Sequence, residues 1–105
     1  MNLIDRDELR EKLERHDEFR LVMALSARSS ANKRIPTSLS FDTAGPALDE
    51  LDRDEEIIVY CGGVYCAESI YAYYRLERAG YRHVRRYAGG IPDWEEAGLP
   101  LERCA

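Results

Sequence analysis

Two cysteines in one short segment are the residues of this sequence best suited to covalent chemistry. Cys61 and Cys66 stand at the two ends of the stretch Cys-Gly-Gly-Val-Tyr-Cys. A cysteine reacts as its thiolate, so a catalytic cysteine needs surroundings that stabilise negative charge. Gly62 and Gly63 let the backbone curl so that amide N–H groups point inward and form an anion-binding nest. The segment therefore predicts a nucleophilic cysteine in a loop that can also hold an anion.

The elements expected on either side of this loop favour the same chemistry. Residues 57–60 are a continuous apolar run, typical of a strand that is buried on both faces. Residues 68–79 predict a helix, and Gly80 stands where a helix-terminating glycine belongs. Free N–H groups and the positive dipole end of that helix would stabilise a thiolate at Cys61. The alternative is that Cys61 is a small buried residue that only closes the strand.

The rest of the chain predicts an α/β fold. Asp5 is expected to cap a first helix that ends near His16, with Glu8 completing a capping box. The other expected elements are strands over 20–25, 38–41 and 83–87, a helical stretch over 47–51, a helix over 91–97 and a loop over 26–34. A strand, a helix and a strand with short connections form a parallel, right-handed βαβ unit. Ligands bind beyond the carboxyl ends of the strands in such a sheet. Cys61 comes directly after the strand expected over 57–60, so we expect it at that end.

Two groups of side chains have expected places on these elements. The buried face of the helix over 68–79 is expected to consist of Ile70, Tyr73, Tyr74 and Leu76. Five arginines form a basic cluster in the second half of the chain: Arg75, Arg78, Arg82, Arg85 and Arg86. This cluster is either a docking face for an acidic protein or an ordinary solvated surface.

Length and charge exclude several classes of function. A chain of 105 residues predicts a single domain over 1–105. The 15 basic and 20 acidic residues give a net charge of −5, which argues against a nonspecific nucleic-acid binder. The apolar runs are far too short to span a bilayer, and no signal peptide precedes the acidic start. We therefore expect a cytoplasmic protein with neither membrane nor nucleic acid as partner.

The sequence resembles rhodanese-like (rhodanese-homology) domains over almost its whole length, and the expected first helix, the strand over 20–25 and the Ile35-Pro36 turn follow the family's order. Ile-Ile-Val-Tyr-Cys, a loop, a helix and Ala-Gly-Tyr precede the most specific part, the pattern Gly89-Gly90-Ile91-x-x-Trp94-x-x-Ala97-Gly98-x-Pro100. The resemblance implies a rhodanese-like fold, a central, mostly parallel sheet flanked by helices on both sides. It also implies that Cys61 is catalytic and carries sulfane sulfur as a persulfide. The sulfur would come from a small or protein donor and pass to a nucleophilic acceptor.

The loop departs from the family's usual Cys-x-x-x-x-Arg-Ser in a definite way. It resembles a longer subgroup form, Cys-x-x-x-x-Cys-x-x-Ser, in which Ser69 matches the family serine and Glu68 takes the arginine's place. Glu68 is expected to face solvent in the first turn of the helix, where the dipole favours a carboxylate. Arg28, Lys33 or Arg34 are the candidates to supply the positive charge. The residues expected to bind the substrate or anion are Gly62, Gly63, Val64, Tyr65, Ala67, Glu68 and Ser69.

Cys66 has two interpretations that the sequence leaves open. It is either a second catalytic thiol, which attacks a persulfide on Cys61, releases sulfide and leaves a disulfide, or a residue that packs beneath the loop. A structural zinc site needs four ligands and only two cluster here, so neither metal nor cofactor is expected. Cys104 makes the number of cysteines odd, which argues against a disulfide scaffold.

The sequence as a whole predicts a sulfurtransferase that is a monomer or weak dimer. One alternative is a catalytically silent rhodanese-like module that binds a partner or senses oxidants through Cys61 and Cys66. The other is an oxyanion reductase or phosphatase of the same fold, since a longer loop admits a larger anion. The absence of a loop arginine counts against that second alternative.

Overall fold

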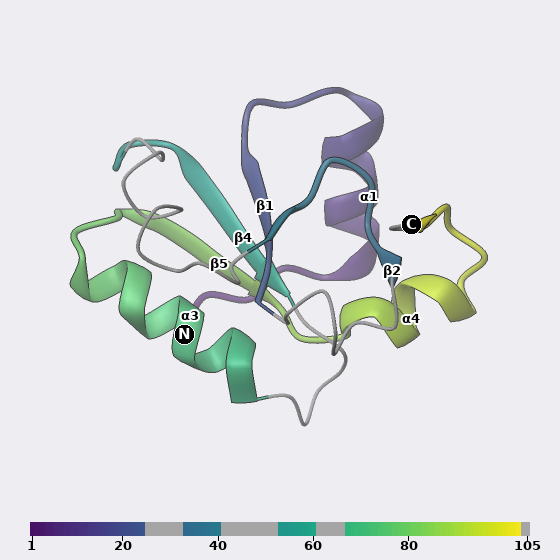
Figure 1. Cartoon of the computed structure of the whole chain (residues 1–105). Helices are drawn as coiled ribbons and strands as arrows, with labels where there is room; N and C mark the ends of the chain where they lie inside the picture. Colours follow the sequence, from purple (N-terminus) through teal and green to yellow (C-terminus); the bar gives the residue numbers. More distant parts are fainter. Residues whose placement is uncertain (25–32, 41–52, 61–66, 104–105) are drawn as a thin grey trace.

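A parallel four-stranded sheet forms the centre of the protein (Figure 1). The computed structural model describes residues 1–24, 33–40, 53–60 and 67–103. The strand order is β3 (Leu39–Ser40), β1 (Arg20–Met23), β4 (Glu56–Tyr60) and β5 (His83–Tyr87), and neighbouring strands are parallel throughout. The predicted α/β class is confirmed, with β1 and β4 in the middle of the sheet.

Helices cover both faces of this sheet. Helix α3 (Ala67–Arg78) lies on one face, and α1 (Arg6–Glu14) and α4 (Gly90–Glu96) lie on the other (Figure 1). Alternate residues of each strand feed two separate cores, as a pleated strand requires. The α3 core contains Val22, Ile57, Val59, Ala72, Tyr73, Leu76, Tyr81 and Val84. The α1/α4 core contains Ile4, Leu9, Leu21, Met23, Ile35, Ile58, Tyr60, Tyr87, Ile91 and Trp94.

The first helix begins where the sequence places its cap. The Asp5 carboxylate accepts a hydrogen bond from the Glu8 backbone N–H at 2.8 Å, which satisfies one of the free donors of the first turn. The Glu8 side chain does not turn back to complete the box, because its carboxylate bonds to Arg85 of β5 instead. The helix ends at Glu14, and His16 adopts a left-handed φ of 57°.

One prediction about local structure is wrong. The loop expected over 26–34 ends in a strand, β2 (Lys33–Arg34), which pairs antiparallel with β6 (Glu102–Arg103) at the other end of the sequence. A two-residue pair whose halves lie so far apart leaves no periodic signal in either half. The helical stretch expected over 47–51 lies outside the described residues.

The buried face of α3 also differs from the expected one. Tyr73 and Leu76 are buried, but Ile70 is 36% exposed and Tyr74 is 43% exposed. Ser69 and Ala72 take their places, at 1% and 3% exposure. The resulting buried stripe has the helical spacing i, i+3, i+4 and i+7 from Ser69. The small side chains of Ser69 and Ala72 on the inner face allow the helix to lie close to the sheet, and Ile70 and Tyr74 remain on its outer face.

Candidate active site

The frame of the candidate loop is well defined. Strand β4 ends at Tyr60 and helix α3 begins at Ala67, so residues 61–66 connect the carboxyl end of a central strand to a helix N-terminus. This is the position the sequence predicts for the site. Six predicted site residues lie outside the described residues, and their roles remain predictions: Cys61, Gly62, Gly63, Val64, Tyr65 and Cys66.

The other three predicted site residues form the first turn of α3. Ala67 is exposed, whereas Ser69 is 1% exposed and points into the protein. The side chain of Glu68 lies outside what the structure describes, so its expected direction remains a prediction. Of the residues assigned to the site from sequence, Ser69 is therefore the one with described side-chain contacts.

A buried hydroxyl network holds the end of β4. The Tyr60 hydroxyl accepts a hydrogen bond from the Ile35 backbone N–H at 3.0 Å and lies 2.6 Å from the Ser38 hydroxyl oxygen. The single Ser38 proton goes to the Ile35 carbonyl, so Tyr60 is the donor to Ser38. Tyr60 is fully buried. The network fixes the residue before Cys61 against the turn at residues 35–38, which includes a left-handed Thr37.

A buried arginine joins the other end of the loop to the sheet. The Arg86 Nε atom donates a hydrogen bond to the Ser69 hydroxyl at 2.8 Å. Arg86 is 7% exposed and comes from β5, where it is in register with Val59 of β4. An arginine rarely occupies such a position without hydrogen-bonded partners, because burial of a charge is costly. The first turn of α3 is thus tied to the strand beside β4.

The N-terminal segment covers the edge of the sheet at this arginine. The Arg86 N–H donates to the Asn2 carbonyl at 2.8 Å, and the Ile4 N–H donates to the Arg86 carbonyl at 3.1 Å. The Asn2 N–H also donates to the hydroxyl of Tyr73 at 3.0 Å. These contacts keep the backbone of Arg86 hydrogen-bonded on its outer side, which an edge strand otherwise leaves open.

The position of Arg86 corrects the expectation for the basic cluster. Arg86 is neither a docking residue nor a solvated one, and Arg85 is paired with Glu8 on the opposite face of the sheet. The alternation in β5 contained the signal, because Val84 is apolar and a residue two positions along the strand shares its face. The charge of Arg86 predicted a surface position, whereas the two-residue period of the strand predicted the buried face on which Arg86 lies.

The glycine-rich pattern after β5 positions helix α4. Tyr87 donates a hydrogen bond to Asp93 at 2.6 Å, and Arg6 of α1 bonds to the other oxygen of that carboxylate at 3.1 Å. A Cβ at Gly89 would lie 2.8 Å from the Asp93 side chain, so only glycine fits. Burial, followed by the bond to Asp93, raises the pKa of Tyr87 well above its ordinary value. Trp94 is buried, and its indole N–H donates to the Pro100 carbonyl.

The architecture of this chain matches that of several solved structures. The chain superposes on the BH2092 protein of Bacillus halodurans with a TM-score of 0.88, at 22% identity, over 97% of this chain and 77% of that one. A rhodanese-like domain protein from Staphylococcus aureus matches with a TM-score of 0.81 and 25% identity over the whole of both chains. The sequence profile of the family described as Rhodanese-like domain matches residues 5–97. The chain belongs to the rhodanese-like domain family.

Curated relatives of this rhodanese-like domain include a regulator and an enzyme. It is 37% identical over 73 residues to an HTH-type transcriptional regulator of Mycobacterium tuberculosis, a match that covers 68% of this chain and 32% of the regulator. It is 36% identical over 64 residues to the thiosulfate sulfurtransferase GlpE of Actinobacillus succinogenes, over 61% of this chain and 56% of that protein. The chain spans less than two thirds of the length of these relatives. A sulfurtransferase-like family is supported.

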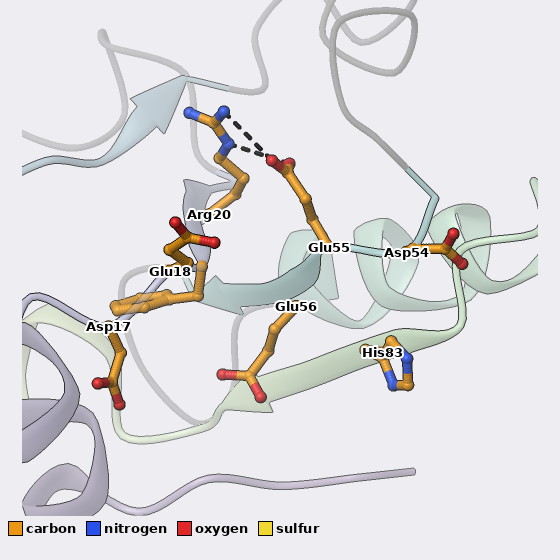
Figure 2. Close-up of a pocket in the computed structure, with 8 residues that line it drawn as sticks. Asp17, Glu18, Arg20, Asp54, Glu55, Glu56 and His83 are labelled. Carbon is orange, nitrogen blue, oxygen red and sulfur yellow. Dashed lines mark hydrogen bonds and ion pairs between the residues drawn. The ribbon is translucent and has the colours of Figure 1, made fainter.

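A second polar region of the rhodanese-like domain lies at the other end of the sheet. A groove of about 760 Å³ lies beside the first residues of three strands. These are Arg20 of β1, Glu56 of β4 and His83 of β5 (Figure 2). The remaining lining residues are Asp17, Glu18, Phe19, Asp54 and Glu55. The groove is therefore separated from the candidate loop by the length of β4, about 13 Å for a strand of its size.

Within the described part of the domain, no group of three or more histidine, cysteine, aspartate or glutamate side chains is arranged to hold a metal ion. None of the helices that the structure describes has the length and apolar character to cross a membrane.

Proposed function

We propose that this rhodanese-like domain is a sulfurtransferase that carries sulfane sulfur as a persulfide on Cys61. The observation that carries the proposal is the position of the candidate loop. Cys61 follows the last residue of β4, and the loop leads into the N-terminus of α3. The positive end of a twelve-residue helix and the amides of a glycine-containing loop favour a thiolate and the anions it reacts with.

The transfer needs two displacement steps at sulfur. The Cys61 thiolate attacks the sulfane sulfur of a donor, and the donor leaves with the electron pair of the broken sulfur bond. For thiosulfate, the substrate class in the names of the GlpE relatives, the leaving group is sulfite. The terminal sulfur of the Cys61 persulfide is then attacked by a thiolate or another nucleophile. This second displacement returns Cys61 as a thiolate, and no cofactor or metal is required.

Cys66 is proposed as a resolving thiol in the same loop. Its thiolate would attack the inner sulfur of the Cys61 persulfide, form a Cys61–Cys66 disulfide and release hydrosulfide. The donor and acceptor are either small molecules or proteins, and the domain would work in the cytoplasm as a monomer or weak dimer, with no nucleic acid or membrane bound.

A second candidate function is thiol sensing without turnover. The match to a transcriptional regulator favours it, because there the corresponding region is part of a regulatory protein. In that case the oxidant being sensed would take two electrons and two protons from the Cys61–Cys66 pair and form a reversible disulfide, and the change would be read by a partner. The same experiment distinguishes the two functions.

The experiment is mass spectrometry of the intact protein and its peptides after incubation with thiosulfate or a low-molecular-weight persulfide. The proposal predicts one added sulfur atom on the peptide that contains Cys61, and none in Cys61→Ser. Cys66→Ser should accumulate more of the adduct if Cys66 resolves it. Cys104→Ser is the matched control, because it removes a thiol outside the loop and should leave the adduct in place.

Two results would count against the sulfur-carrier proposal. An adduct that persists in Cys61→Ser would assign the chemistry to another thiol. The absence of any adduct in Cys66→Ser with either donor, together with a Cys61–Cys66 disulfide that forms in the parent protein when no donor is present, would favour the sensing function instead.

A further inference from the structure

The most unusual charged residue among those the structure describes is Arg86. Its side chain lies inside the protein, on the α3 face of β5, and donates to the buried hydroxyl of Ser69. Arginine keeps its positive charge in proteins, because its guanidinium group does not lose a proton under physiological conditions. The fold therefore holds a permanent positive charge beneath the first turn of α3.

Arg86 contacts the frame of the candidate loop at both ends. Its backbone is in register with Val59, two residues before Cys61. Its side chain bonds to Ser69, three residues after Cys66. Arg86 therefore contacts both the strand that precedes the loop and the helix that follows it.

Arg86 lies beside the strand residues that precede the loop. Val59 is its partner in β4, and Tyr60, the residue before Cys61, is in register with the adjacent Tyr87. Neighbouring strands are about 4.8 Å apart. The Debye length is about 10 Å at 0.1 M salt, and a buried charge is screened less than an exposed one. The field of Arg86 therefore extends over the end of β4, where Cys61 follows in the sequence.

We propose that Arg86 is a positioning residue for Cys61, which anchors the first turn of α3 to β5 and supplies a fixed positive charge that favours the thiolate. The proposal rests on the assignment of Cys61 as the reactive cysteine. In this role Arg86 acts from β5, the strand beside β4, and Ser69 holds its guanidinium group in place.

The test measures how fast Cys61 is alkylated by iodoacetamide as a function of pH. It is made in a background in which Cys66 and Cys104 are serine, so that Cys61 is the only thiol among the three cysteines. Arg86→Gln keeps a donor for Ser69 but removes the charge, and we expect alkylation at pH 7 to be about tenfold slower, with the midpoint of the profile at higher pH. Arg86→Lys keeps the charge and should restore most of the rate.

Arg85→Gln is the matched control for the loss of a charge. It removes an arginine one residue away whose side chain points to the opposite face and pairs with Glu8. Its alkylation profile should therefore coincide with that of the parent protein. Ser69→Ala keeps the charge but removes its anchor, and we expect alkylation about threefold slower. The Ser69 variant also decides the question if thermal denaturation shows that Arg86→Gln does not fold.

Three results would overturn the proposal. They are an unchanged profile in Arg86→Gln, a Lys variant that is as slow as the Gln variant, and, where Arg86→Gln does not fold, an unchanged profile in Ser69→Ala. Because alkylation requires no sulfur donor, these outcomes are independent of whether Cys61 forms a persulfide. Persulfide formation with an unchanged Arg86→Gln profile would overturn this inference alone. Slower alkylation without any persulfide would overturn the sulfurtransferase proposal alone.

Discussion

The two ends of the central sheet are stabilised in different ways. At the carboxyl end, where the candidate loop is attached, the polar contacts are buried: Tyr60 with Ser38, and Arg86 with Ser69. At the amino end, the groove in Figure 2 is lined by charged side chains that pair at the surface, such as Arg20 with Glu55. Both ends are rich in polar groups, but their exposure to water differs.

This difference in burial decides how much each contact contributes. A buried hydrogen bond is expensive to remove, because the remaining partner is cut off from water. An exposed ion pair is cheap to remove, because water and salt replace the lost partner. The carboxyl end is therefore the end at which a substitution should destabilise the fold most.

The largest effect is expected at Tyr60. Tyr60→Phe leaves the Ile35 N–H and the Ser38 hydroxyl oxygen without their partner in a fully buried place. We expect a loss of about 3 kcal/mol in the free energy of unfolding, measured by urea denaturation. Tyr71→Phe is the matched control: the same hydroxyl is removed from a residue that is 76% exposed, and the change should stay within about 0.5 kcal/mol. Equal losses of unfolding free energy in the two variants would contradict the expected difference between buried and exposed contacts.

A smaller effect with a distinct pH dependence is expected at Tyr87. Its pKa is raised by burial and by the bond to Asp93, so the neutral form is favoured in the folded state. The stabilisation is complete below the ordinary tyrosine pKa of about 10 and is lost as the pH rises above it, when the unfolded state ionises first. Tyr87→Phe should cost about 1.5 kcal/mol at pH 7.

The alkaline limb of the stability curve checks the assignment to Tyr87. The difference between the parent protein and Tyr87→Phe should shrink as the pH is raised from 9 to about 11. A gap for Tyr87→Phe that stays constant over this range would show that its hydroxyl does not titrate differently in the folded state.

Much of this sheet was predictable from strong local patterns. The apolar runs over 57–60 and 20–25 predicted β4 and β1, and Asp5 marked the start of α1. The β2–β6 pair was missed, because each strand is two residues long and its partner lies at the other end of the sequence. Such pairing is decided by the tertiary fold and leaves no period to detect.

The candidate site was predictable only in part. The spacing within the resemblance identified Ser69, which the structure places on the buried face at the start of α3. Arg86 was assigned to a surface cluster because its charge outweighed its position in the strand alternation. The buried face of α3 was predicted wrongly for the same reason, because residue type was given more weight than position. Ile70 and Tyr74 are apolar but lie outside the buried stripe that contains Ser69 and Leu76.

The smallest effect is expected at the amino end of the sheet, at the pair between Arg20 and Glu55. Two hydrogen bonds of 3.0 and 3.3 Å join the groups, but their side chains are 50% and 34% exposed. Arg20→Gln should cost about 0.5 kcal/mol, and less in 1 M salt, where the charges are screened. A double-mutant cycle with Glu55→Gln measures the coupling directly. A coupling above about 1.5 kcal/mol would show that geometry can outweigh exposure, because this exposed bidentate pair would then contribute as much to stability as a buried hydrogen bond does.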